Sequence, residues 1–154
     1  MPAAPLLRPI PDDELLINRT FDAPVALVYR VWTRPEFMVR WWGPREFTCP
    51  GVTMDFREGG AWRASIRSVA DGESHMSGIY REIVPNQRLV FTFRWELEGA
   101  LDTVITVTFT EKDGKTLQSF HQTPFRSVAE RDSHIGGWTE CLVKQEAYVE
   151  GQAA

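Results

Sequence analysis

The stretch SVAERDSHIGGWTECLVKQEAYVE, residues 127–150, predicts one long helix near the C-terminus, and this helix decides the fold. Ser127 and Glu130 form an S-x-x-E capping box at its start. An apolar stripe follows at helical spacing, made up of Ile135, Trp138, Leu142 and Val149, with Cys141 and Tyr148 at its flanks. At 1.5 Å per residue the helix would be roughly 36 Å long, which is enough to cross a whole sheet.

Two adjacent glycines interrupt this helix at positions where alanine would be more stable by about 1 kcal/mol each. Gly137 falls at the flank of the apolar stripe, and Gly136 falls nearly opposite the stripe. We expect the pair to reflect local bending, or the close approach of a neighbouring loop where any side chain would clash. The functional alternative is that a helix softened beside Trp138 shifts outward to admit a ligand.

Upstream of the helix, short alternating runs predict six successive antiparallel strands between residues 47 and 121. Turn residues separate the strands at 58–60, 71–72, 85–86, 98–99 and 113–114. The alternation puts these apolar side chains on one face: Trp62, Ala64, Ile66, Leu89, Phe91, Phe93, Trp95, Ile105, Val107 and Phe109. The other face carries arginine, threonine, serine and glutamate, so one face is expected to be covered and the other solvated.

The N-terminal part of the chain predicts three further elements. Residues 14–21 alternate as a strand does, and residues 22–32 and 34–44 predict two short helices, each with a proline near its start. Four of the ten prolines fall within the first eleven residues, so residues 1–13 are expected to be a flexible segment. Residues 14–150 are then expected to form a single domain.

This order of elements resembles the helix-grip fold of the START-like (SRPBCC) superfamily. The motifs resemble more closely the family of activator of heat-shock protein 90 ATPase homologues, through FDAPVALVYRVWTRPEFMVRWWGP, FREGG, GIYREIVPNQRLVFTFRW, TVTFTE and a C-terminal H-x-x-G-W-x-x-C-L. The resemblance covers about residues 14 to 150. It implies an α+β fold, in which a curved antiparallel sheet of about seven strands wraps around the C-terminal helix and leaves a cavity between them. The superfamily includes carriers, cyclases and co-chaperone domains, so the fold alone selects no function.

Composition and charge exclude several classes of partner. The net charge is −4 and no block of lysine or arginine occurs, which argues against nucleic acid and against an anionic membrane surface. Neither a run of 18 apolar residues nor a secretory signal is present, so a cytoplasmic location is expected. Cys49 and Cys141 lie far apart in sequence and are expected to be reduced thiols.

The sequence offers little that predicts catalysis. His75, His121 and His134 lack metal-ligand spacing, and nucleophile-elbow, P-loop and dinucleotide motifs are missing, so we expect no metal or cofactor and assign no catalytic residue. His121 ends the last strand, and His134 lies one helical turn before Trp138. Both are expected at the cavity rim as hydrogen-bonded side chains. The alternative is general acid or base work in a cyclase or hydrolase.

Two adjacent tryptophans in RWWGP, Trp41 and Trp42, cannot both point into the same core. One is expected to pack and the other to border an opening. Two alternatives stay open: both tryptophans clamp the pair of short helices onto the sheet, or one of them forms a lid over the cavity mouth.

The favoured hypothesis is therefore a domain that binds a small apolar or aromatic ligand between sheet and helix, with His121, Tyr80 or Gln145 orienting the ligand. The predicted ligand-binding residues are Trp41, Trp42, Trp62, Ile66, Tyr80, Phe91, Phe93, Trp95, Ile105, Val107, His121, His134, Trp138, Cys141 and Gln145. Two alternatives stay open. One is a co-chaperone that stimulates a heat-shock ATPase, and the other is a cyclase or hydrolase that uses His121 or His134.

Overall fold

Seven strands and three helices follow one another along residues 11–153, which are the residues that the computed structural model describes. Their bounds are β1 (Leu15–Phe21), α1 (Val25–Arg30), α2 (Pro35–Met38), β2 (Thr48–Met54), β3 (Ala61–Ser68), β4 (Gly72–Val84), β5 (Arg88–Trp95), β6 (Thr103–Lys112), β7 (Lys115–Thr123) and α3 (Val128–Ala153). The strands form one antiparallel sheet in the order β1-β7-β6-β5-β4-β3-β2.

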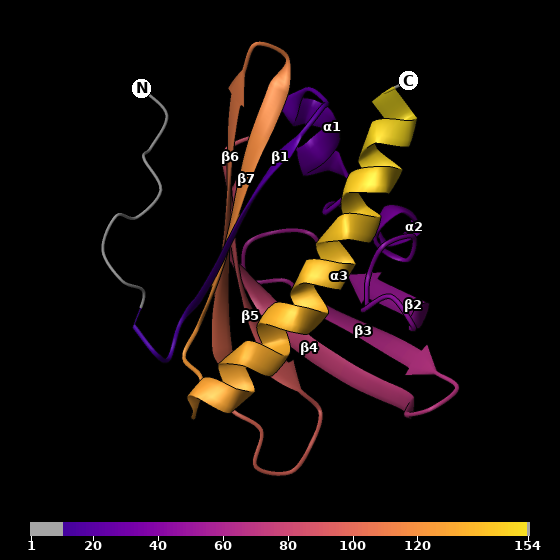
Figure 1. Cartoon of the computed structure of the whole chain (residues 1–154), viewed down its shortest axis with the longest axis vertical. Helices are drawn as coiled ribbons and strands as arrows, with labels where there is room; N and C mark the ends of the chain where they lie inside the picture. The colour runs from indigo at the N-terminus through magenta and orange to yellow at the C-terminus, as the bar shows by residue number, and fades with distance from the viewer. Residues whose placement is uncertain (1–10, 154) are drawn as a thin grey trace.

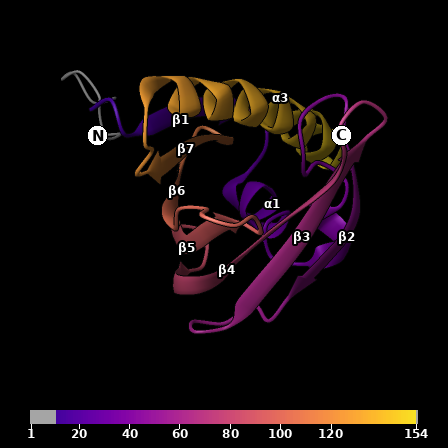
Figure 2. The ribbon, with the colours of Figure 1, turned by 90° about the horizontal axis from the view of Figure 1, so that it is seen from below.

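The sheet curves around α3, which lies across its inner face (Figures 1 and 2). The helices α1 and α2 lie on the same side of the sheet as α3, near the C-terminal half of α3. This arrangement is the predicted α+β helix-grip fold. The predicted turns also lie between the observed strands, because glycine, asparagine and aspartate there allow the backbone to reverse. At the β6–β7 hairpin, for example, Asp113 and Gly114 both have positive φ, at 54° and 76°.

Asp13, one residue before the predicted start of the domain, already contacts the sheet. Residues 1–10 of the predicted flexible segment lie outside the described residues. The carbonyl oxygen of Asp13 accepts hydrogen bonds from the Phe125 amide at 2.9 Å and from the Thr123 hydroxyl at 3.1 Å. Asp13 is therefore held against the end of β7.

The second predicted helix is shorter than expected. The helix α2 ends at Met38, and Trp41 and Trp42 follow it in a turn in which both amides donate to the Met38 carbonyl oxygen, at 3.2 and 3.0 Å. Gly43, with φ at 103°, then changes the direction of the chain. Because the two tryptophans lie in a turn, they can point to different sides.

Aromatic side chains fill the middle of the space between sheet and helix. Trp32 and Trp41 are 2% and 0% exposed, and their rings meet edge to face with centroids 4.7 Å apart. Trp32 also stacks on Phe120 of β7 at 6.4 Å. The apolar face predicted for β3, β5 and β6 is indeed the buried face, so the interior beside these tryptophans is packed.

The long helix α3 begins at the predicted capping box, but only one of the two bonds of that motif forms. The Glu130 amide donates to the Ser127 hydroxyl at 3.1 Å, as predicted, whereas the Glu130 carboxylate accepts from the Arg126 amide at 3.3 Å instead of from the Ser127 amide. The buried face of α3 consists of Trp138, Cys141, Leu142, Gln145 and Val149.

Two buried glutamines of β7 bind this helix face to the sheet. Gln122 accepts from the Trp138 indole N–H at 2.8 Å. Gln118 accepts from the Trp32 indole N–H at 2.9 Å, and its own amide donates to Gln145 of α3 at 2.8 Å. Since buried polar groups are costly without partners, these bonds fix how α3 lies on β7.

Candidate ligand-binding site

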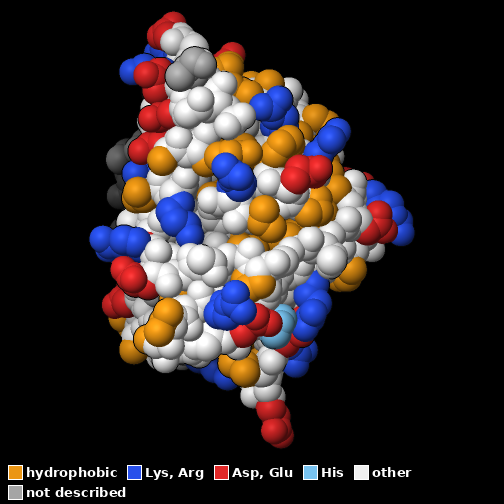
Figure 3. Space-filling model, turned by 90° about the vertical axis from the view of Figure 1, so that its right-hand side faces the viewer, with side chains coloured by type: hydrophobic (Ala, Val, Ile, Leu, Met, Phe, Trp, Pro, Cys, Tyr) orange, Lys and Arg blue, Asp and Glu red, His pale blue; other side chains and the backbone are white. Residues whose placement is uncertain are grey.

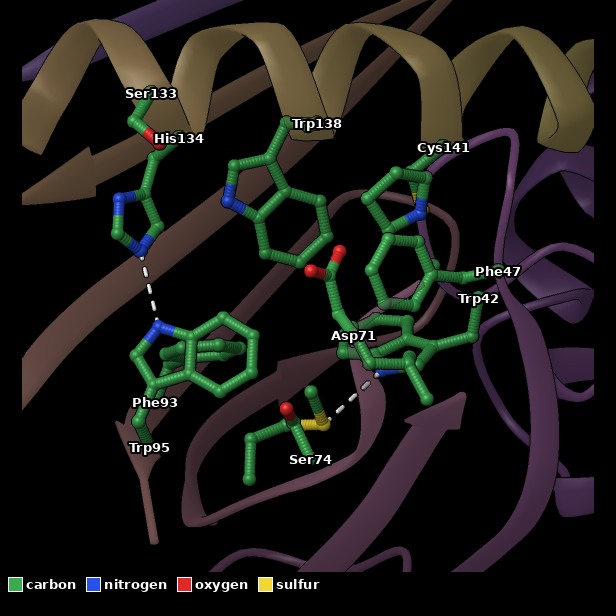
Figure 4. A pocket seen from close by; sticks show the side chains of 15 residues that line it. Trp42, Phe47, Asp71, Ser74, Phe93, Trp95, Ser133, His134, Trp138 and Cys141 are labelled. Atoms are coloured by element: carbon green, nitrogen blue, oxygen red, sulfur yellow. Dashed lines mark hydrogen bonds between the residues drawn. The ribbon is translucent and has the colours of Figure 1, made fainter. Parts of the chain in front are cut away.

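A cavity of about 330 Å³ lies between the N-terminal half of α3 and strands β3, β4 and β5 (Figure 4). We call it the Trp138 pocket. Its lining consists of Trp42, Gly43, Pro44, Phe47, Ile66, Asp71, Ser74, Met76, Phe93, Trp95, Ser133, His134, Gly137, Trp138 and Cys141. Asp71 and Ser133 are exposed at its rim, whereas Trp42, Phe93 and Trp138 are buried within it. The volume is in the range of small-molecule sites, which start at about 300 Å³.

The Trp138 pocket brings together about half of the predicted ligand-binding residues: Trp42, Ile66, Phe93, Trp95, His134, Trp138 and Cys141. They come from the turn after α2, from β3, from β5 and from α3. Strand alternation predicted the members from β3 and β5, helical spacing predicted those from α3, and the adjacent tryptophans of RWWGP predicted Trp42. Whether these residues bind a ligand stays a prediction.

Several other predicted residues lie in the packed core behind the lining and do not line the Trp138 pocket. They are Trp41, Trp62, Tyr80, Phe91, Ile105, Val107 and Gln145. Their placement at the cavity is wrong because Trp32 packs against Trp41 and Phe91, and these rings occupy the space over the centre of the sheet. Gln145 is 0% exposed and bonded to Gln118, and the Tyr80 hydroxyl donates to the Met54 sulfur at 3.6 Å. Burial also raises the pKa of Tyr80.

His121 lies on the outer face of the sheet, so its prediction as a cavity residue is wrong. Gln118, Phe120 and Gln122 are the inward residues of β7, and alternation therefore turns His121 outward. There its Nε2 lies 2.6 Å from the Glu14 carboxylate. The version of the enzyme hypothesis that places His121 at a sequestered substrate fails for the same reason.

The pocket also contains residues that the sequence reasoning missed. Phe47 and Asp71 lie on connecting segments, where periodicity gives no signal. Ser74 and Met76 of β4 pair with Ile66 and Ala64 of β3. Pairing β3 with β4 about the turn at 71–72 would have identified them, because directly opposed residues share one face.

His134 lines the pocket, and both of its ring nitrogens make hydrogen bonds within the protein. The indole N–H of Trp95 lies 3.0 Å from Nε2 of His134, and Nδ1 of His134 lies 2.9 Å from the Glu130 carbonyl oxygen. An indole can only donate, so Nε2 accepts and Nδ1 carries the proton that is donated to Glu130. The ring is therefore neutral. A general base role would require Trp95 to release Nε2 first.

The two adjacent tryptophans divide their roles as predicted. Trp41 packs in the core, and its N–H donates to the Val31 carbonyl oxygen at 3.2 Å. Trp42 borders the Trp138 pocket, and its N–H donates to the Met76 sulfur at 3.4 Å (Figure 4). A thioether is a weak acceptor, so the Trp42 N–H keeps most of its capacity for a stronger partner.

Cys141 lines the pocket as an inert thiol. Its Sγ donates to the Trp41 carbonyl oxygen at 3.3 Å, and burial raises the pKa of the thiol to about 12. Because the thiolate is the nucleophilic form, this cysteine is unreactive near neutral pH. Cys49 is half-buried and also free, and burial raises its pKa as well.

The paired glycines of α3 face different surroundings. A Cβ added to Gly137 would lie 3.5 Å from Cγ of Pro44, in the loop that lines the pocket. A Cβ added to Gly136 would meet no atom within 4 Å. The expectation that a side chain would clash with a neighbouring loop is therefore wrong at both glycines, because a Cβ at Gly137 would make only ordinary van der Waals contact with Pro44 and a Cβ at Gly136 would lie in open space. The helix α3 continues through both glycines.

A second cavity of about 210 Å³, which we call the Arg126 pocket, adjoins the first. It lies under the β5–β6 connection and Phe125, and it shares Phe93, Trp95 and His134 with the Trp138 pocket. The hydrogen bond between Trp95 and His134 thus joins two side chains that border both pockets.

Residues 11–153 contain no group of three histidine, cysteine, aspartate or glutamate side chains placed to hold a metal ion. Within the same part of the chain, every helix is too short or too polar to cross a membrane. Figure 3 shows apolar, basic and acidic side chains interspersed over one face of the molecule.

Comparison with protein families gives one match. The family described as Activator of Hsp90 ATPase homolog 1-like protein matches residues 22–150, which is most of the chain. No curated protein matches.

Among solved structures, a protein from Chromobacterium violaceum has a TM-score of 0.81 and 26% identity, and the match covers 90% of this chain and 97% of that chain. A protein from Rhizobium leguminosarum has a TM-score of 0.75 and 26% identity, and the match covers 89% of this chain and 93% of that chain. An AHSA1 protein from Silicibacter pomeroyi has a TM-score of 0.79 at 19% identity, with 90% and 99% covered, and shows the shared fold.

Proposed function

The chain belongs to the family of Activator of Hsp90 ATPase homolog 1-like proteins, and from this premise we propose that it binds a small apolar or aromatic molecule in the Trp138 pocket. The observation that carries the proposal is a cavity of about 330 Å³ whose mostly apolar lining includes five aromatic residues, beside the packed core around Trp32 and Trp41. A partly open and mostly apolar cavity of this size, with few polar groups, is typical of small-molecule binding.

Burial of apolar area supplies the driving force for such binding. A ligand that removes about 200 Å² of apolar surface from water gains about 5 kcal/mol, before the cost of its lost freedom of motion. The N–H of Trp42 can orient the ligand, because its present acceptor is only the Met76 sulfur. Trp42 thus takes the orienting role that the sequence had suggested for His121, Tyr80 or Gln145.

The two glycines of α3 provide a matched test. Gly137→Leu places a side chain at the pocket, whereas Gly136→Leu points the same side chain into open space. We expect the neutral dye N-phenyl-1-naphthylamine to bind the unmodified protein and Gly136→Leu with a saturable rise in emission. We expect at least tenfold weaker binding by Gly137→Leu. Circular dichroism and thermal melting show whether both variants are folded.

The proposal fails if the dye does not bind the unmodified protein, or if a folded Gly137→Leu variant binds the dye as tightly as Gly136→Leu does. In the first case the cavity holds no apolar ligand of this size. In the second the dye occupies another surface.

Stimulation of a heat-shock ATPase is the second candidate function, and the family's name is the observation that favours it. A steady-state ATPase assay tests it. Turnover that rises with added protein and saturates supports this function, and turnover that is unchanged at saturating protein removes it.

A cytoplasmic location also remains a prediction. It is supported by two free cysteines, since reduced thiols are usual in reducing compartments. Fractionation of cells that express the protein, with a cytoplasmic marker enzyme as reference, tests this location.

A further inference from the structure

Five aromatic side chains surround the Trp138 pocket: Trp42, Phe47, Phe93, Trp95 and Trp138. Several of them meet edge to face. The ring centroids of Trp42 and Trp138 are 5.2 Å apart at 78°, and those of Phe93 and Trp95 are 5.4 Å apart at 86°. Aromatic faces carry negative potential and attract cations, most strongly where water is excluded. The lining is therefore suited to a positive charge as well as to an apolar body.

One carboxylate stands at the rim of this aromatic lining. Asp71 belongs to the β3–β4 turn, and Figure 4 shows its carboxylate pointing from the turn toward α3. The Asp71 amide donates to the Ser68 hydroxyl at 2.9 Å, which holds the turn. The carboxylate makes no ion pair with any residue among 11–153. Its charge is thus available to a ligand in the pocket.

Among residues 11–153, no lysine or arginine lines the pocket and competes with a ligand for the position beside Asp71. His134 also lines the pocket, but it is neutral while Trp95 donates to its Nε2. Lys144 approaches the loop that carries Pro44 and Phe47, where its ammonium donates to the carbonyl oxygens of both residues, at 3.3 and 3.2 Å. Lys144 does not line the pocket. Asp71 is then the one formal charge of the lining.

We propose that the ligand of the Trp138 pocket is an organic cation, with an apolar or aromatic body among the aromatic rings and an amine or quaternary ammonium group near Asp71. This inference rests on the proposed function, because it names the class of ligand for the same pocket. A purely apolar cavity favours a hydrocarbon over a cation of the same shape, since the cation gives up its hydration on entry. Aromatic faces together with a carboxylate offset that loss.

Two probes of the same shape separate charge from burial. Phenyltrimethylammonium carries the charge, and tert-butylbenzene is its neutral isostere. Both are to be titrated against the unmodified protein, Asp71→Asn and Asp113→Asn, by competition with bound N-phenyl-1-naphthylamine. Asp113 is the matched control, because it also precedes a glycine in a hairpin turn but lies at the β6–β7 turn, outside the Trp138 pocket.

We expect the unmodified protein and Asp113→Asn to bind the cation at least as tightly as the hydrocarbon. In Asp71→Asn the affinity for the cation should fall at least threefold, and that for the hydrocarbon should stay within twofold. If the hydrocarbon binds tighter than the cation, or if Asp71→Asn changes cation affinity by less than threefold, the cation proposal is overturned while ligand binding by the pocket stands. If neither probe nor the dye binds, the proposed function itself fails, and this inference fails with it.

Discussion

The indole N–H of Trp138 on α3 donates to the side-chain oxygen of Gln122 on β7 at 2.8 Å, in a buried contact between helix and sheet. Replacement of Gln122 by leucine leaves that N–H without its acceptor. The free energy of unfolding should fall by about 1–3 kcal/mol, which is the cost of an unsatisfied buried donor. Urea denaturation measures this. Gln87→Leu, at an exposed turn position, is the matched control and should stay within about 0.5 kcal/mol. Equal stability of the two variants would contradict the assigned role of Gln122.

The proton on His134 is predicted to lie on Nδ1. Trp95 donates to Nε2, and the Glu130 carbonyl oxygen accepts at Nδ1. Long-range ¹H–¹⁵N NMR spectra at neutral pH should show the neutral ring with Nδ1 protonated. In Trp95→Phe the donor to Nε2 is lost, and the ¹⁵N shift of Nε2 should move. A ring protonated on Nε2 in the unmodified protein would contradict the geometry.

Cys141 should make the folded protein less stable as the pH rises into the alkaline range. Burial raises its pKa in the folded protein from 9.0 to about 12, so between these values only the unfolded chain loses the proton. Stability is fully present below pH 9 and should fall above it by about 1.4 kcal/mol per pH unit for this group. Urea denaturation between pH 8 and 10.5 measures the slope.

Cys141→Ala is the control for this slope. Its absolute stability will differ, because the substitution changes packing, but its stability should decline less steeply above pH 9 than that of the unmodified protein. Parallel slopes would show that Cys141 does not carry the effect.

Replacement by alanine should lower the stability of the protein at Gly78 and raise it at Gly136. Gly78 on β4 lies under the Trp62 indole, and an added Cβ would be 1.8 Å from the Thr92 carbonyl oxygen. Gly78→Ala should therefore destabilise the fold strongly, by more than about 3 kcal/mol. Gly136→Ala meets no atom within 4 Å and should stabilise α3 by about 0.5–1 kcal/mol. Thermal melts of both variants test this pair, and similar melting temperatures would contradict it.

Local patterns explain why most of the fold could be predicted. Turn residues such as Asp113 and Gly114 adopt positive φ almost regardless of the rest of the chain, and period-two alternation identified the buried face of β5 and β6 correctly. The capping box at Ser127 acts within one helical turn, and the start of α3 was accordingly predicted to within one residue.

The candidate site was predicted less well, because it depends on contacts between distant segments. The alternation of side chains along the strands placed Phe91 and Ile105 on the inner face. Alternation could not show that Trp32 and Trp41 fill the space above the centre of the sheet. On β7 the prediction that His121 faces the cavity is one residue out of phase with the buried residues Gln118, Phe120 and Gln122, so His121 lies on the outer face. Asp71 and Phe47 lie on connections that have no period, so their position follows only from the folded chain.

The six tryptophans allow the most direct test of the central claim, that the Trp138 pocket admits a ligand. Trp42, Trp95 and Trp138 line the pocket, whereas Trp32, Trp41 and Trp62 do not. The measurement is a titration of ¹⁵N-labelled protein with N-phenyl-1-naphthylamine, followed through the six indole N–H signals. The account predicts clearly larger shifts for the three pocket tryptophans than for the other three. Shifts of equal size over all six, or larger shifts at Trp32, Trp41 and Trp62, would contradict it.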